Sequence, residues 1–319
     1  TNTMVRPGSD AAVVRIKGTN KALAMTVDCN SRYCLLHPYE GARLAVAEAA
    51  RNLVCSGAEP IGLTDCLNFG NPERPEIMWQ FVLAIEGLKD ACEHFAIPIV
   101  SGNVSFYNET NGLSIYPTPM LGMVGLIDSA DKTMTQWFKQ DGDEILLLGK
   151  GREDLGGSEY LKVLHHREQG SPPLLNLETE KALHDFLLKI IREGAVQSAH
   201  DCSDGGLSVA LAECCISAPD SRRGAVVQLP LDASRLDALL FGESQSRVVL
   251  SVKPEMAGQL LNRAWDSGIP AMKIGVVGGD RFVIDVEKGQ WSEGCRIDLP
   301  VNQLYDRWAF SIERTLNET

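Results

Sequence analysis

A strand–helix–strand pattern in the first third of the chain constrains its fold more than any other feature. A short apolar run at residues 60–63 is followed by a helical pattern over residues 76–95 and by a second apolar run at residues 97–100. In the middle segment the apolar residues recur every three or four positions, as they do along one face of a helix. Two strands joined by such a helix run parallel, so their carboxyl ends meet at one edge of a sheet.

Each apolar run leads into a polar stretch that contains glycine. Residues 64–72 read Thr-Asp-Cys-Leu-Asn-Phe-Gly-Asn-Pro, and residues 101–108 read Ser-Gly-Asn-Val-Ser-Phe-Tyr-Asn. Considered alone, the second stretch is more typical of an ordinary Gly–Asn turn, because such turns are common. The presence of the first stretch at the same expected sheet edge favours a site for a nucleotide and its metal ion.

Four residues of these stretches are the candidates for that site. Asp65 offers a carboxylate at the end of the first strand, and Gly102 lets another group approach the backbone closely. Asn103 and Ser105 are two positions apart, so they would face the same side of a strand. An acid, an amide oxygen and a hydroxyl suit a phosphate with its divalent cation. We therefore expect Asp65, Gly102 and Asn103 to face one cleft.

The composition limits the classes of protein to which the chain can belong. Its 319 residues are enough for about two domains, and its net charge of −12 argues against a nucleic-acid partner. No apolar run approaches the roughly 18 residues of a membrane helix, and no secretory leader is expected. The nine cysteines include no Cys-x-x-Cys pair and are typical of free thiols in the reducing cytoplasm.

The polar segment 128–143 is the expected domain boundary. It predicts a first domain at 1–140 and a second at 141–319, in which strands and helices alternate without a strict rhythm. The segments expected in the first domain include strands at 11–16, 22–28 and 120–127 and a helix of small residues at 42–56. The fold class is therefore α/β or α+β.

A glycine-rich loop in the second domain is a candidate anion site. Ser203 or Asp204 would cap a helix that begins at the following glycines, so that free backbone N–H groups point toward the loop. The alternative is an ordinary capped helix without a ligand.

Other polar residues of the first domain have open interpretations. Asp10 and Asp28 lie at strand edges and are possible neighbours of a metal ion, although Asp10 is more typical of a solvated turn carboxylate. Glu48, Arg51 and Asn52 are polar positions on a helix of otherwise small residues, and such a helix usually packs closely against a sheet.

Several common motifs are absent. The sequence has no Gly-x-x-x-x-Gly-Lys-Ser/Thr loop, no Gly-x-Gly-x-x-Gly fingerprint, no histidine pair with zinc-ligand spacing and no Gly-x-Ser-x-Gly elbow. A nucleotide site in this chain would therefore be of a less common type.

Eight sequence runs together resemble a known family. They lie at residues 38–42, 48–52, 56–60, 64–72, 101–109, 155–160, 200–207 and 240–247. In this order, and over nearly the whole chain, they closely resemble the C-terminal half of the synthetase subunit of the phosphoribosylformylglycinamidine synthase family.

The resemblance implies a fold, a reaction and site residues. The fold would have two domains, shared with aminoimidazole ribonucleotide synthetase and its superfamily. The reaction would be a ligase step of purine biosynthesis, in which ATP phosphorylates the amide oxygen of formylglycinamide ribonucleotide and ammonia displaces the phosphate. The resemblance further implies that Asp65 and Gly102 bind ATP, that Asn103 binds Mg²⁺ and that Ser105 contacts the ribonucleotide.

Two departures from the family pattern bear on activity. The family's catalytic His-Asn-His-Pro run is missing, and residues 30–37 read Asn-Ser-Arg-Tyr-Cys-Leu-Leu-His at the comparable place. No glutaminase domain follows Trp308, which is similar to the small form of the subunit, served by a separate glutaminase and a small accessory protein. We therefore expect half of an enzyme, with no catalytic residue of its own and inactive without the N-terminal half.

Two further interpretations stay open, and one partner is expected. The chain could be a non-catalytic nucleotide-binding scaffold half, or another ATP-dependent enzyme of the superfamily such as a small-molecule kinase. The resemblance also implies that the first domains of two halves close into a shared barrel. The apolar strands at 11–16 and 120–127 would then be exposed without the N-terminal half, which predicts a homodimer interface on the order of 2,000 Å² or more.

Overall fold

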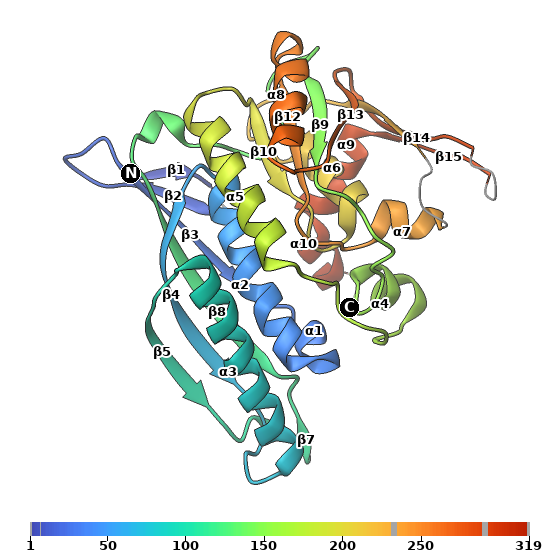
Figure 1. The fold of residues 1–319 in the computed structure, drawn as a ribbon. Coiled ribbons are helices and arrows are strands. Elements are labelled where there is room, and N and C mark those ends of the chain that lie inside the picture. Colours follow the sequence, from blue (N-terminus) through green and yellow to red (C-terminus); the bar gives the residue numbers. More distant parts are fainter. Residues whose placement is uncertain (1, 7, 231–234, 289–292, 318–319) are drawn as a thin grey trace.

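The computed structural model describes residues 2–6, 8–230, 235–288 and 293–317, which form two large sheets (Figure 1). The first sheet has the order β1 (Thr3–Val5), β2 (Ala12–Arg15), β3 (Ala22–Asp28), β8 (Thr118–Ile127), β4 (Glu59–Asn68) and β5 (Ile99–Ser105). The second has the order β10 (Ser198–Asp201), β12 (Val248–Val252), β9 (Glu144–Leu148), β13 (Ala271–Val277), β11 (Ala225–Leu229), β14 (Arg281–Val286) and β15 (Cys295–Pro300). A short hairpin joins β6 (Glu109–Thr110) to β7 (Leu113–Ser114).

Helices accompany both sheets. They are α1 (Ser31–Leu36), α2 (Pro38–Cys55), α3 (Pro75–Phe95), the 3-10 turn η1 (Ala130–Lys132), α4 (Glu159–His165), α5 (Leu177–Arg192), α6 (Gly206–Ile216), α7 (Leu236–Phe241), α8 (Pro254–Asp266), α9 (Val301–Ala309) and α10 (Ser311–Asn317). Within the described ranges, none of them is both long enough and apolar enough to cross a bilayer.

The predicted crossover is present as β4, α3 and β5. The two strands are parallel neighbours, and α3 runs between them with Pro75 in its first turn. A Cβ atom on Gly87 of α3 would lie 2.2 Å from the carbonyl oxygen of Tyr39, so α3 and α2 pack at very short range. The crossover therefore places the ends of β4 and β5 side by side, as the sequence predicts.

Helix α2 lies between the first sheet and the second domain. Its alanines are buried against the first sheet, while Val54 and Cys55 at its end pack in the core of the second domain. Figure 1 shows α2 next to α5, with which it is in contact. The helix begins before the predicted residue 42, because Pro38 suits a first turn and His37 accepts the Glu40 N–H.

One face of the first sheet is covered by α2 and α3, and no described element covers the other. Along β8 the buried residues Leu121, Met123 and Ile127 alternate with partly exposed ones. On β3 the outward-facing Val27 is 66% exposed. The second domain contacts α2 and α3 through α5 and β10, on the covered side, so it does not hide this face.

Candidate functional site

Strands β4 and β5 bring Asp65 and Gly102 together. The two residues pair directly across the parallel strands. A Cβ atom on Gly102 would lie 2.2 Å from Oδ1 of Asp65, so only glycine leaves room for the carboxylate. Partial burial raises the pKa of Asp65 above its usual value, and the backbone N–H of Asn103 donates to the carboxylate and opposes that shift. The predicted proximity of Asp65 and Gly102 is confirmed.

The side chain of Asn103 lies on the opposite face of the sheet, so the prediction of one cleft shared with Asp65 is wrong. The pairing between the strands passes over Val100, which forms a β-bulge in β5. Beyond the bulge Asp65 pairs with Gly102, and alternation along the strand turns Asn103 to the other side. Without the extra residue, Asn103 would share the face of Asp65.

Asn103 and Ser105 share the face that the helices leave uncovered, as their spacing predicts. The Ser105 hydroxyl lies 3.2 Å from the side chain of Asn108. The Asn108 amide donates at 2.9 Å to the carbonyl oxygens of Phe69 and Ser105, which fixes the turn after β5. Because β5 is the last strand of the sheet, its outer edge is open to a ligand.

A second polar cluster joins the two domains around Arg51 of α2, whose side chain is fully buried. Its Nη1 atom lies 2.7 Å from Glu180, its Nε atom lies 3.2 Å from Asp201, and its Nη2 donates to Gln245 at 3.1 Å. Burial alone would raise the pKa of Glu180, but Arg51 and His184 hold it at about 2. These contacts tie α2 of the first domain to α5 and the second sheet.

Asp28, Glu48, Asn52 and Asp201 bring oxygen atoms to the same junction. Glu48 and Asn52 are one turn apart on α2, and the Asn52 amide lies 3.3 Å from both carboxylate oxygens of Asp28. Burial and the nearby charge of Asp201 raise the pKa of Asp28 to about 6. Burial and both neighbouring acids raise the pKa of Glu48 well above its usual range. A bound cation would lower the pKa of both acids, and a set of oxygen donors suits Mg²⁺.

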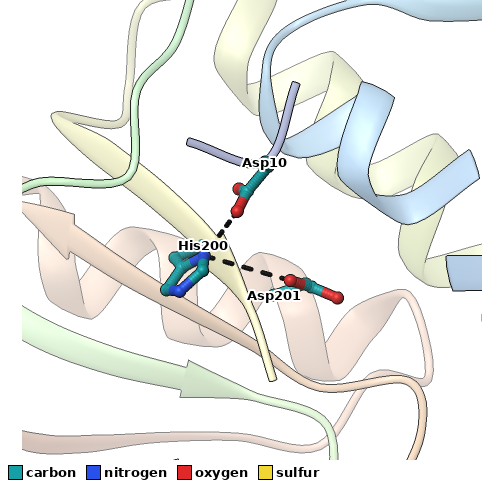
Figure 2. A group of neighbouring side chains, drawn as sticks. All are labelled: Asp10, His200 and Asp201. Carbon is teal, nitrogen blue, oxygen red and sulfur yellow. Dashed lines mark hydrogen bonds and ion pairs between the residues drawn. The ribbon is translucent and has the colours of Figure 1, made fainter. Parts of the chain in front are cut away.

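Asp10, His200 and Asp201 form a third group, in which one atom from each residue lies within 4.8 Å of the others (Figure 2). Nδ1 of His200 is 2.5 Å from Asp10, and Nε2 is 3.1 Å from Glu213. Although burial opposes it, these carboxylates raise the pKa of His200 well above its usual value. The side chain of Asp10 is 4% exposed and forms an ion pair with His200 of the second domain. The expectation that Asp10 is a solvated carboxylate is therefore wrong.

Replacing His200 with glutamine is expected to remove a pH dependence of the free energy of unfolding. The folded-state pKa lies above the unfolded value of about 6.5, so the stabilisation is complete below that pH and is lost as pH rises through the folded-state pKa. Urea unfolding between about pH 6.5 and 9 should show falling stability for the natural chain and a flatter profile for the variant. The exposed His165→Gln variant is the control. If the free energy of unfolding fell equally steeply with pH in all three proteins, His200 would not be the source of the pH dependence.

The glycine loop of the second domain already holds a carboxylate from the same chain. Helix α6 begins at Gly206, and neither Ser203 nor Asp204 caps it with a side chain. Oε1 of Glu243 instead accepts the N–H of Gly205 at 2.8 Å. The predicted side-chain cap is therefore wrong. Glu243 occupies the place that an external anion would take at the N–H of Gly205, while anion binding by the rest of the loop stays a prediction.

Sequence reasoning did not predict that Glu180, His200 and Glu243 would belong to a buried network. Each has a partner more than 100 residues away in the chain, namely Arg51, Asp10 and Tyr33 respectively, and no periodic pattern links them. The one usable signal is Arg51 itself, since a charged residue among buried alanines requires a partner.

Two family models match the chain. They are AIR synthase related protein, N-terminal domain, over residues 8–127, and AIR synthase related protein, C-terminal domain, over residues 140–287. The phosphoribosylformylglycinamidine synthase subunit PurL of Caldanaerobacter subterraneus is 52% identical over 309 residues, and that of Moorella thermoacetica is 50% identical over 312 residues. These alignments cover 97% and 98% of this chain, but the chain spans only 41% of the length of either relative.

Solved structures share the fold. The structure of T. maritima PurL complexed with FGAR has a TM-score of 0.78 at 21% identity and matches 95% of this chain and 49% of that one. A structure of the HypE–HypF complex has a TM-score of 0.66 at 18% identity and matches 91% of this chain and 93% of that one. The predicted fold, an N-terminal domain followed by the C-terminal domain of one superfamily, is confirmed. The chain therefore belongs to the AIR synthase related protein family, and within that family it is similar to part of the PurL subunit.

Proposed function

We propose that the chain is the C-terminal half of the synthetase subunit of phosphoribosylformylglycinamidine synthase. In the cytoplasm it would take part in the ATP-dependent conversion of formylglycinamide ribonucleotide (FGAR) to the amidine. The observation that carries this proposal is the 52% identity to PurL over 97% of the chain. Structures of T. maritima PurL complexed with FGAR and with ATP support the two substrates, and PurLQS supports an assembly with further subunits. Those subunits would be the glutaminase that supplies ammonia and the small accessory protein.

In this proposal Asp65 and Gly102 contribute to ATP binding, Asn103 holds Mg²⁺ and Ser105 contacts FGAR. Asp65 on β4 and Gly102 on β5 share one face of the sheet, and Asn103 and Ser105 on β5 share the other. A ligand that wraps around the open edge of this last strand would reach both faces. The amide oxygen of Asn103 is a ligand that suits Mg²⁺. The division into domains at 1–140 and 141–319 is part of the same proposal.

A chimeric subunit tests the function. This chain would replace the matching segment of the C. subterraneus PurL, and we expect the chimera to form the amidine from ATP, FGAR and ammonia. The isolated chain should be inactive, because it lacks the family's histidine run. Asn103→Ala in the chimera should lower activity by about tenfold or more, and Asn111→Ala in the β6–β7 turn should not. A folded but inactive chimera, or turnover by the isolated chain, would contradict the proposal.

The oxygen donors at the domain junction favour a second function, in which this half of the subunit binds a nucleotide without catalysing a reaction. We propose that Asp28, Glu48, Asn52 and Asp201 hold Mg²⁺ with its nucleotide, since the positive charge would lower the raised pKa values of the half-buried Asp28 and Glu48. Magnesium ADP should then raise the melting temperature of the natural chain but not of Glu48→Gln. The exposed Glu86→Gln on α3 is the control, and an equal rise in both variants would count against this function.

We also propose that, without the N-terminal half, the chain pairs with a second copy through the uncovered face of the first sheet. Light scattering should give about twice the chain mass of 34.8 kDa. Val27→Asp should return the mass to that of one chain, because a charge on this face opposes its burial. Val163→Asp on α4, where valine is 60% exposed, is the control. A single-chain mass for the natural protein would rule out the dimer.

A further inference from the structure

A cavity of about 440 Å³ lies within the second domain, and its lining includes none of the residues of the polar clusters around Asp65, Arg51 and His200. Its lining comes from β9, β11, β13, α6, α7 and α8. The walls are largely apolar and include Leu147, Leu207, Leu229, Leu239, Trp265 and Met272. A cavity of this size with apolar walls and few polar groups is typical of a site for a small organic molecule.

The buried charged group in the wall of this cavity is Arg247, which is only 2% exposed. Its Nε and Nη2 atoms donate to the backbone carbonyls of Ser244 and Gly242 at 2.9 and 2.6 Å. Its Nη1 atom lies 3.5 Å from the position of a Cβ on Gly151, which lines the same cavity. Among the described residues, none places a carboxylate within 4.0 Å of Arg247. A buried cation without a counter-ion is costly, so the cavity is electrostatically suited to an anion.

The loop that follows β9 adds to the positive charge. Lys150 and Arg152 line the cavity and are exposed to solvent, and neither forms an ion pair with any residue that the structure describes. One acid, Glu153, lies beside them. The three basic side chains therefore outnumber the acid, in a chain whose net charge is −12.

We infer that this cavity binds a small amphipathic organic anion. Its apolar body would fill the space between α7, α8 and β13, and its carboxylate or phosphate would accept from Nη1 of Arg247. Charge-assisted hydrogen bonds of this kind are roughly twice as strong as neutral ones, so the anion should bind more tightly than a neutral analogue of the same shape. The site is independent of the proposed synthetase activity, because none of the residues given a role in that reaction lines the cavity.

The test uses two probes of equal shape, followed by ¹⁹F NMR with the whole chain. We expect saturable binding of 4-(trifluoromethyl)benzoate and at least tenfold weaker binding of 4-(trifluoromethyl)benzamide. Equal affinity for the two probes, or no saturable binding of benzoate, would overturn the inference.

Matched variants locate the binding. Met272 and Val276 lie on the same strand and are 36% and 38% exposed, but only Met272 lines the cavity. Met272→Trp should fill the cavity and lower benzoate affinity at least tenfold, whereas Val276→Trp should leave it unchanged. Independently, Lys150→Gln at the exposed mouth of the cavity should lower the affinity for benzoate about threefold and leave the affinity for benzamide unchanged. The exposed Lys162→Gln is the control and should change neither affinity. If Met272→Trp folds and binds benzoate as the natural chain does, the probe binds elsewhere. If Met272→Trp does not fold, unchanged benzoate binding by Lys150→Gln leads to the same conclusion.

Discussion

Arg51→Met is expected to lower the free energy of unfolding by about 3–5 kcal/mol, because it leaves two buried acids without their cation. Arg51 and Glu180 are fully buried, and Asp201 is 2% exposed. Methionine keeps most of the volume of the side chain, so the loss would come from charge and hydrogen bonds and not from a cavity. Urea unfolding followed by circular dichroism measures the change.

The control for this variant lies on the same helix. Arg43 pairs with Glu40 and Asp90 near the surface, where an ion pair is worth about 1 kcal/mol or less. Arg43→Met should therefore change stability far less than Arg51→Met. A second change, Glu180→Gln, should recover part of the loss in the Arg51→Met background, because it removes one of the unpaired charges. A change below about 1 kcal/mol for Arg51→Met would show that the cluster contributes little to stability.

The crossover at β4, α3 and β5 could be predicted from the sequence because it depends on local periodicity. Apolar residues at helical spacing between two short apolar runs leave few other arrangements. Which residues share a face at its end could not be predicted in the same way. A single extra residue at Val100 reverses the faces of every later residue on β5, and the sequence carries no mark of it.

The buried network between the domains was beyond sequence reasoning for a different reason. Arg51, Glu180 and Asp201 meet only after both domains have formed, and each lies in a segment whose pattern is that of an ordinary helix or strand. The loop at Gly205 shows the converse error. Free N–H groups could be anticipated there, but the carboxylate that accepts the N–H of Gly205 comes from Glu243, 38 residues further along the chain.

Gly102→Ala is expected to lower the amidine-forming activity of the chimeric subunit by about 10²-fold, because displacing a site group by about 1 Å has effects of that size. The new methyl group would lie 2.2 Å from Oδ1 of Asp65, well inside van der Waals contact. The carboxylate must therefore leave its place above the strand. Steady-state assays with ATP, FGAR and ammonia measure the loss.

A matched variant separates this local effect from general damage. Gly258 lies in α8, and a Cβ atom there would meet nothing within 4 Å, so Gly258→Ala should retain full activity. Gly102 lies on the last strand of the sheet, where the displaced Asp65 side chain can turn into solvent, so we expect the sheet of Gly102→Ala to persist. Thermal unfolding of the variant checks this. If Gly102→Ala were folded and within threefold of the natural activity, the position of the Asp65 carboxylate would not matter to the reaction. The proposed part of Asp65 in ATP binding would then have to be abandoned, while the family assignment would stand.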